Sequence, residues 1–469
     1  MKTTVAPTYA TLDVANDEWQ FFAADGTPYP DEWTDGVTSD MQVRFASYAE
    51  YTALKTKNVS PSMFVMTGFT MPEGLGEVDA TVGMVYQFDE GIVIDAKGNS
   101  LKLPAGMMFG EKAFTVTSSV AGGEVVIDIA SGTSRNTAMA LSGSLKVTKK
   151  GAGTFVSALS QTYTGGTDVE AGTVRPPDAP ADGNYAYAGD TFKAFGTGMI
   201  DVHSGAVFDV RGNYGYTNVC LKGGSLSNTL RAMSQNPKPG MFAASLAEDS
   251  RLDMFCENGK FAGKYGHPSL ATDLGGKTLQ VIVWNDLSVR SALTNGTVKV
   301  VESNGWFRLD EPFDMRTTTF DNQCAIQVNY DVELGTYIQR KNTPYILGSG
   351  KMTIHERFVP VSGTYFYGCA MLPGSTLDLS QRDTLFTSSC TNHENKVYSV
   401  VFPASGTLNV EVGARRVKTG DQLVRWEAKP VGTAKFTLTR HGAPVVGRSL
   451  AVKDDGIYMG MSGVLIIVR

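Results

Sequence analysis

Apolar and polar residues alternate in short runs between Leu141 and Arg175, the most regular stretch of the chain. These runs are separated by Gly151-Ala152-Gly153 and by Gly165-Gly166. Alternation with a period of two is typical of strands that bury one face, and closely spaced glycines mark sharp turns. The pattern therefore predicts a chain that winds through short strands and turns repeatedly, rather than one that folds back once.

Weaker copies of this pattern recur along the chain, and their uneven spacing is what irregular coils of one solenoid would produce. The copies lie at Ile92–Leu103, Gly196–Asn213, Ile346–Ser380 and Ser405–Val412. Alternate side chains of a coil point into its interior. The residues predicted to point inward are Ile200, Val202, Phe208, Val210, Leu377 and Leu379, and those predicted to point outward are Asp201, His203, Asp209 and Asp378.

The best repeat carries a specific set of residues at fixed positions. They are Leu145, Lys149, Gly151, Gly153, Thr154, Phe155, Tyr163, Thr164, Gly165, Gly166, Thr167, Val169, Gly172, Thr173 and Val174. This set resembles the passenger-associated repeat of bacterial autotransporters, although Phe155 and Val174 stand where that repeat more often has leucine. The resemblance implies a right-handed parallel β-helix in a secreted or cell-surface protein of a Gram-negative-type bacterium.

The two ends of the chain depart from the repeat. Residues 1–80 are aromatic and acidic, with one helix-like stretch at 46–56, and residues 417–469 contain longer strands around a turn at Asp454–Gly456. This ending resembles those of repeat-bearing surface proteins of the Verrucomicrobia–Lentisphaerae type. Because an open solenoid end exposes an unpaired sheet edge, we predict an N-terminal cap over 1–80, a parallel β-helix over 81–416, and an antiparallel β cap or small β-domain over 417–469.

Composition narrows the setting of this all-β fold. The 51 glycines and a charged fraction of 19% are typical of a turn-rich extracellular protein. A net charge of −6 argues against nucleic acid as a partner. The chain has no apolar run long enough for a transmembrane helix, and its first residues lack the apolar core of a secretory signal. The resemblance to surface proteins then implies an exported protein whose signal has been removed.

Enzymes of the β-helix class that act on polysaccharides place clustered carboxylates, with Arg or Lys, on one outer face. The best candidate cluster is Asp201 and His203 on one strand, with Asp209 and Arg211 nearby. However, Asp209 and Asp378 occupy the same place in two copies of the repeat. The chemistry of a solenoid corner explains that recurrence without catalysis, and we predict that the chain is not an enzyme.

The sequence offers no motif for a metal or a cofactor, and we predict neither. The histidines lack ligand spacing, no nucleotide-binding loop is present, and Asp168 in a single Gly-Gly-Thr-Asp unit is better explained as a turn or ladder residue than as a calcium ligand. Cys369 and Cys390 are about one coil apart. They could form a disulfide between neighbouring coils or, as the favoured interpretation, remain buried free thiols.

Paired tyrosines are the only candidate ligand contacts. Tyr185 with Tyr187, and Tyr214 with Tyr216, would each lie on one side of an extended segment and could grip sugar rings or a partner surface. Packing over protruding loops is the alternative.

We therefore expect an extracellular structural or adhesive β-helix, with polysaccharide or other surface proteins as partners and self-association through its ends as a further mode. The alternatives are a carbohydrate-active lyase or hydrolase and a self-assembling fibre or sheath subunit. Convergence of two or more carboxylates in a groove on one outer face would favour the enzyme.

Overall fold

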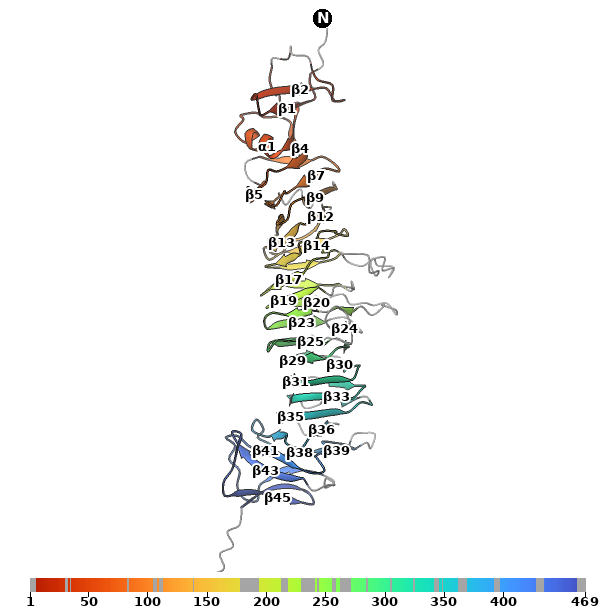
Figure 1. Ribbon diagram of the computed structural model, residues 1–469, viewed down its shortest axis with the longest axis vertical. Helices are drawn as coiled ribbons and strands as arrows, with labels where there is room; N and C mark the ends of the chain where they lie inside the picture. Colours follow the sequence, from red (N-terminus) through yellow and green to blue (C-terminus); the bar gives the residue numbers. More distant parts are fainter. Residues whose placement is uncertain are drawn as a thin grey trace, which may run out of the picture. The chain divides into compact units, whose positions relative to one another are not determined.

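The computed structural model divides into two compact units, Met1–Arg211 and Gly212–Arg469, each built almost entirely of strands (Figure 1). It describes residues 6–29, 33, 35–81, 84–103, 108, 113–137, 139–177, 194–211, 218–228, 241–242, 244–254, 259–261, 271–283, 286–303, 306–323, 325–340, 346–347, 349–361, 369–391, 397–426 and 434–461. In both units successive turns of the chain place their strands side by side and mostly parallel. The fold is thus the predicted parallel β-solenoid.

The described strands of the N-terminal unit form three sheets. The first contains β1 (Tyr9–Asp13), β2 (Glu18–Phe22), β3 (Gln42–Ser47), β4 (Met63–Thr70), β6 (Tyr86–Phe88), β7 (Val93–Asp95), β9 (Phe114–Ser118) and β12 (Met139–Gly143). The second contains β5 (Glu77–Asp79), β8 (Ser100–Lys102), β10 (Glu124–Asp128), β13 (Lys146–Lys150), β15 (Thr167–Val169) and β17 (Ile200–His203). The third contains β11 (Ser134–Thr137), β14 (Thr154–Ser157), β16 (Thr173–Arg175) and β18 (Val207–Asp209).

The strand register defines the length of a coil. Glu124 lies opposite Lys146 and Val147 lies opposite Thr167, so consecutive coils advance by 22 and 20 residues. Leu101, Val125 and Val147 form one continuous inner row with no exposed surface. Stacking of equivalent apolar residues from coil to coil thus builds the core of this unit.

Two glycines of the best repeat are required by close contacts between coils. Gly151 and Gly172 both have positive φ angles, of +70° and +71°. A Cβ atom on Gly151 would lie 2.4 Å from the carbonyl oxygen of Ile129, and one on Gly172 would lie 2.3 Å from that of Gly153. No larger residue fits at these corners, which explains why glycine interrupts the alternation there.

In the C-terminal unit one long sheet carries most of the coils. Its parallel strands are β20 (Ser225–Asn228), β23 (Ser250–Met254), β26 (Thr278–Val283), β29 (Gly296–Ser303), β31 (Phe313–Asn322), β33 (Val332–Gln339), β35 (Met352–Pro360), β37 (Thr376–Asp378), β41 (Thr407–Glu411) and β43 (Lys435–Arg440), with β36 (Cys369–Met371) also pairing with β35. A second sheet contains β21 (Met241–Phe242), β24 (Gly259–Phe261), β27 (Asp286–Val289), β30 (Trp306–Leu309), β32 (Ala325–Val328) and β34 (Ile346–Leu347). Two further parallel pairs join β19 (Val219–Lys222) to β22 (Ala244–Leu246) and β25 (Thr272–Asp273) to β28 (Leu293–Thr294).

Aromatic residues stack inside this unit. Phe320, Tyr337 and Phe358 occupy equivalent positions on neighbouring coils, and their ring centroids are 6.2 and 5.7 Å apart. All three are almost completely buried. Stacked rings of this kind add to the stabilisation from burial alone.

The predicted inner residues are confirmed, because all six have no exposed surface. Among the residues predicted to point outward, Asp201 and His203 are partly exposed, whereas Asp209 and Asp378 are only 4% exposed. Asp378 is covered because the Arg357 guanidinium lies 2.9 Å from its Oδ2. Asp209 and Asp378 therefore alternate with the inward residues as predicted, but they are buried rather than exposed on the outer face.

A helix and antiparallel strands occur at the N-terminal end. Strand β2 pairs antiparallel with β1, and α1 (Tyr48–Leu54) lies where the sequence predicted a helix. Ser47 caps α1 by accepting a hydrogen bond from the Glu50 amide, while the Glu50 carboxylate accepts one from the Ala46 amide at 2.9 Å. Parallel pairing already begins between β1 and β3.

The C-terminal end is also antiparallel, as predicted. Strands β42 (Gln422–Arg425), β46 (Gly456–Met461) and β45 (Arg448–Lys453) form an antiparallel group, with β38 (Phe386–Thr387) parallel to β42. Two further antiparallel pairs join β43 to β44 (Ala443–Pro444) and β39 (Ser389–Thr391) to β40 (Val397–Ser399). The turn at Asp454–Gly456 joins β45 to β46. The boundaries at residues 80 and 417 stay predictions.

Candidate functional site

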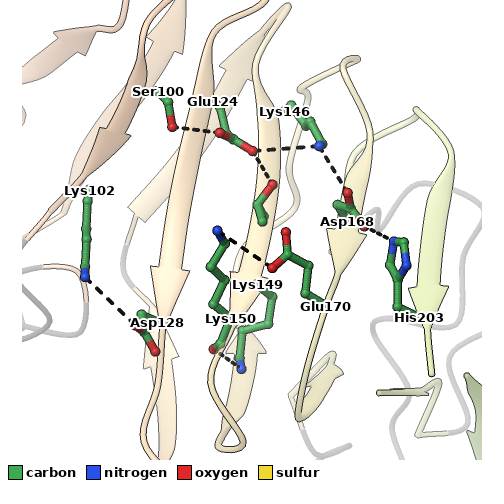
Figure 2. A network of polar contacts seen from close by, with 11 residues as sticks. Ser100, Lys102, Glu124, Asp128, Lys146, Lys149, Lys150, Asp168, Glu170 and His203 are labelled. Carbon is green, nitrogen blue, oxygen red and sulfur yellow. Dashed lines mark hydrogen bonds and ion pairs between the residues drawn. The ribbon is translucent and has the colours of Figure 1, made fainter. Parts of the chain in front are cut away.

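Outward side chains of the N-terminal unit form a polar ladder across strands β8, β10, β13, β15 and β17 (Figure 2). We define the polar ladder as Ser100, Lys102, Glu124, Asp128, Lys146, Thr148, Lys150, Asp168, Glu170 and His203. Because the strands are parallel and in register, residues one coil apart meet side by side. The polar ladder includes His203 of the predicted cluster and is therefore a candidate catalytic site.

Glu124 lies at the centre of the polar ladder. Its Oε2 accepts a hydrogen bond from Ser100 at 2.7 Å, its Oε1 accepts one from the Thr148 hydroxyl, and the Lys146 ammonium lies 3.7 Å away. Burial alone would raise the pKa of Glu124, but the Thr148 and Ser100 hydrogen bonds and Lys146 outweigh it and keep the pKa below its usual value. Glu124 is therefore held as an anion and is unsuited to act as a general acid near neutral pH.

Asp168 joins the predicted His203 to the polar ladder. Its Oδ2 lies 3.1 Å from the Lys146 ammonium and its Oδ1 lies 2.5 Å from Nε2 of His203, while Asp201 lies opposite Asp168 in register. The side chain of Asp168 is only 18% exposed. The interpretation of Asp168 as a ladder residue is confirmed, and the sequence did not predict its contact with His203.

The remaining ladder residues pair in the same way. Lys150 lies 3.7 Å from Glu170, and Lys102 lies 3.9 Å from Asp128. Each of these contacts joins neighbouring coils. Exposed pairs of this kind contribute little individually, but together they hold the outer faces of consecutive coils in register.

The structure does not bring the predicted cluster of Asp201, His203, Asp209 and Arg211 together on one face. Asp201 and His203 lie on β17, whereas Asp209 lies on β18 in a different sheet. The Asp209 Oδ1 accepts a hydrogen bond from the backbone amide of Arg211, and Asp378 accepts the equivalent bond from the amide of Ser380. Both aspartates thus close a turn two residues on, as corner residues do.

Lys149 points into the interior, which the sequence analysis did not foresee. It lies in register with the buried Ile127 and Val169 and has no exposed surface. Its ammonium donates hydrogen bonds to the carbonyl oxygens of Lys150, Gly151 and Ala171 at 2.6, 2.7 and 3.2 Å. Burial lowers the pKa of Lys149 to about 8, with the charge of Asp128 opposing the shift. The repeat's lysine is therefore a structural cation that ties together the corners of two coils.

A second group of charges lies in the C-terminal unit, on β31, β33 and β35. Asp314 lies opposite Glu333 in register, which places two carboxylates on neighbouring coils. Arg316 donates to Asp314 from Nε at 2.8 Å, and the hydrogen bonds from Arg316 hold the pKa of Asp314 below its usual value. Glu333 contacts Nε2 of His355. Two carboxylates thus converge here, but each already has a basic partner.

The predicted ligand contacts, Tyr185, Tyr187, Tyr214 and Tyr216, lie outside the described residues. Within the described part of the chain, no group of three or more His, Cys, Asp or Glu side chains is placed to hold a metal ion. Cys369 is a buried free thiol rather than the partner of Cys390 in a disulfide, and its burial raises its pKa to about 12.

Comparison with known proteins gives no match to a protein family, to a curated protein or to a solved structure. No helix among the described residues is both long and apolar enough to cross a membrane. The β-solenoid class therefore rests on the strand pairing of the chain itself.

Proposed function

We propose that this chain is a structural and adhesive β-solenoid of the bacterial cell surface or extracellular space, and that it has no catalytic activity. The observation that carries the proposal is the mutual pairing of outward charges. In the polar ladder, Glu124, Lys146 and Asp168 contact one another across coils, and in the C-terminal unit Asp314 and Glu333 are paired with Arg316 and His355. Charges arranged this way stabilise a scaffold.

The mechanism is mechanical. Parallel coils with a continuous apolar interior and interlocked outer charges resist local opening, so they hold an attached surface or module away from the cell. The resemblance of Leu145–Val174 to the autotransporter passenger repeat supports an exported location. Polysaccharide and other surface proteins are the proposed partners, and loops between coils would carry the specificity.

The strands at the ends of the solenoid favour a monomeric protein over a self-assembling fibre. The β1–β2 hairpin lies at one edge of its sheet, and antiparallel strands occupy the end of the C-terminal unit. Glu411, which is 4% exposed, also accepts backbone hydrogen bonds from Gly413, His441 and Gly442 at 2.6, 2.8 and 2.9 Å. Such antiparallel strands replace the parallel coil edge to which the first coil of another solenoid would add. Light scattering should give a monomer, and filaments formed by the intact chain would favour the fibre.

Absence of catalysis is tested with pectate and alginate as substrates and mass spectrometry of the products. We expect both polymers to remain intact. The carbohydrate-active alternative would replace the structural function if the chain cleaves either polymer and the cleavage is abolished by Asp168→Asn, Asp201→Asn or Glu333→Gln. The control Asp455→Asn, in the exposed β45–β46 turn, should retain any such cleavage. The location is tested by antibody labelling of intact cells of the source bacterium, and labelling only after lysis would overturn it.

A further inference from the structure

A polar groove of about 340 Å³ crosses four coils of the C-terminal unit. It lies over β20, β23, β26 and β29, and its lining residues are Gly223, Ser225, Asp249, Ser250, Arg251, Thr278, Gln280 and Lys299. No apolar side chain is among them, so the groove suits a ligand rich in hydrogen-bonding groups rather than a lipid or an apolar segment.

Four of these residues form one row. Ser225 lies opposite Arg251, Arg251 opposite Gln280, and Gln280 opposite Lys299, each one coil further along. We call Ser225, Arg251, Gln280 and Lys299 the groove row. Parallel strands are about 4.8 Å apart, so the two steps from Arg251 to Lys299 span about 10 Å. The row therefore presents its polar groups along a line that crosses the strands.

Three of the four side chains of the groove row lack protein partners in the described part of the chain. Within the described part of the chain, the Ser225 hydroxyl, the Gln280 amide and the Lys299 ammonium make no hydrogen bond or ion pair. Arg251 donates from one terminal nitrogen to Asp253 at 2.7 Å, but its Nε is buried and has no partner. Buried polar groups are usually satisfied, and an unpaired one points to a missing partner.

The chemistry of the groove row matches a carboxylated sugar. The groove lining has two cations, Arg251 and Lys299, and one carboxylate, Asp249, which already accepts the backbone amide of Thr278 at 2.8 Å. Because Asp253 pairs with Arg251, Lys299 is the positive charge of the groove that has no acidic partner among the described residues. An arginine fork fits a carboxylate, a lysine supplies a second positive charge, and amide and hydroxyl groups both donate to and accept from sugar hydroxyls.

We propose that the groove binds an acidic polysaccharide lying across the coils. Its carboxylates contact Arg251 and Lys299, and its hydroxyls contact Gln280 and Ser225. The distance of about 10 Å between Arg251 and Lys299 is longer than a single small anion could bridge, which favours a polymer over a free anion. This proposal deepens the adhesive role proposed above by giving it a ligand class, and it rests on that role.

The test is isothermal titration of the full chain with a short oligogalacturonide, with a neutral galactose oligomer of equal length as the comparison. We expect binding of the acidic oligomer only, weakened about tenfold by Lys299→Ala or Gln280→Ala. The control Lys435→Ala, which removes an exposed lysine from β43, should leave binding unchanged. Because the Gln280 and Lys299 side chains have no partners in the described part of the chain and Lys435 is exposed, circular dichroism should show unchanged folding in every variant.

Several outcomes overturn the groove site: no binding by the wild type, equal binding of the neutral oligomer, or equal loss in the control variant. Monomeric galacturonate or sulfate that competes as well as the oligomer would reduce the site to one for small anions and overturn the polymer. Mass spectrometry of the recovered oligomer separates the two proposals. Cleavage of the oligomer would overturn the non-catalytic function but not the binding site. Absence of binding by a protein that is labelled on intact cells would overturn the binding site but not the structural function.

Discussion

The polar ladder of the N-terminal unit and the groove row of the C-terminal unit are built in the same way but differ in how their side chains are satisfied. Both are rows of outward residues brought into register by parallel strands. In the ladder, Glu124, Lys146 and Asp168 find partners on neighbouring coils. In the groove row, Gln280 and Lys299 find none in the described part of the chain.

The order of charges explains this difference. From Glu124 through Lys146 and Asp168 to His203, acids and bases alternate from coil to coil, so each coil supplies a partner for the previous one. The groove row reads Ser, Arg, Gln, Lys and contains no acid. The same register that neutralises one surface therefore concentrates unpaired donors on the other. A solenoid can thus convert a stabilising face into a binding face by changing which residues recur.

The largest effect on stability is expected from a substitution in the apolar interior. Both the polar ladder and the groove row depend on this interior to hold their strands in place. Phe208 is completely buried and packs edge-on against Phe195 at 5.4 Å. Phe208→Ala should lower the free energy of unfolding of the N-terminal unit by about 3–5 kcal/mol, because it removes a large core side chain and leaves a cavity. Urea denaturation followed by circular dichroism measures this. A loss below about 1 kcal/mol would mean that the outer pairs, rather than the core, hold the coils together.

A smaller effect is expected from breaking the polar ladder. Glu124→Gln should cost about 1 kcal/mol at neutral pH, because Lys146 loses one of its two acidic partners and two hydroxyls lose a charged acceptor. Since the folded state holds the pKa of Glu124 below its usual value, its contribution is present above about pH 4.5 and is lost as pH falls through the folded pKa. Thermal melts should show wild type and variant converging in acid. Parallel curves would show that Glu124 is not part of a coupled network.

Lys149 gives a pH dependence of the same sign at higher pH but for a different reason, because burial disfavours its charged form. Its pKa is lowered from 10.5 to about 8 in the folded protein, so between these values the unfolded chain binds more protons and stability rises with pH. Relative to Lys149→Met, the wild type should gain thermal stability as pH increases from about 8 to 10. Melting curves at closely spaced pH values measure the difference. An unchanged difference would mean that the three carbonyl hydrogen bonds fully compensate the burial of the ammonium.

Alternation was sufficient to predict the interior, and repeat position was sufficient to explain Asp209 and Asp378 as corner residues. The same alternation could also have predicted that Lys149 points inward, because it lies two residues from the inward Val147 on the same strand. The groove row could not be predicted. Arg251 and Gln280 become neighbours only through a coil 29 residues long, whose length no sequence pattern fixes. Likewise, the corner between β17 and β18 separated Asp201 from Asp209, although the two lie close in sequence.

The smallest effect on stability should come from the groove row, and it separates the two regions most directly. Lys299→Ala should change the free energy of unfolding by no more than about 0.5 kcal/mol, because a side chain without a protein partner leaves none unsatisfied. The matched ladder variant, Lys146→Ala, removes a lysine that contacts both Glu124 and Asp168 and should cost more. Urea denaturation of both variants in the same buffer makes the comparison. Equal losses would show that the groove lysine stabilises the fold as the ladder lysine does, and the distinction between a paired and an unpaired face would then fail.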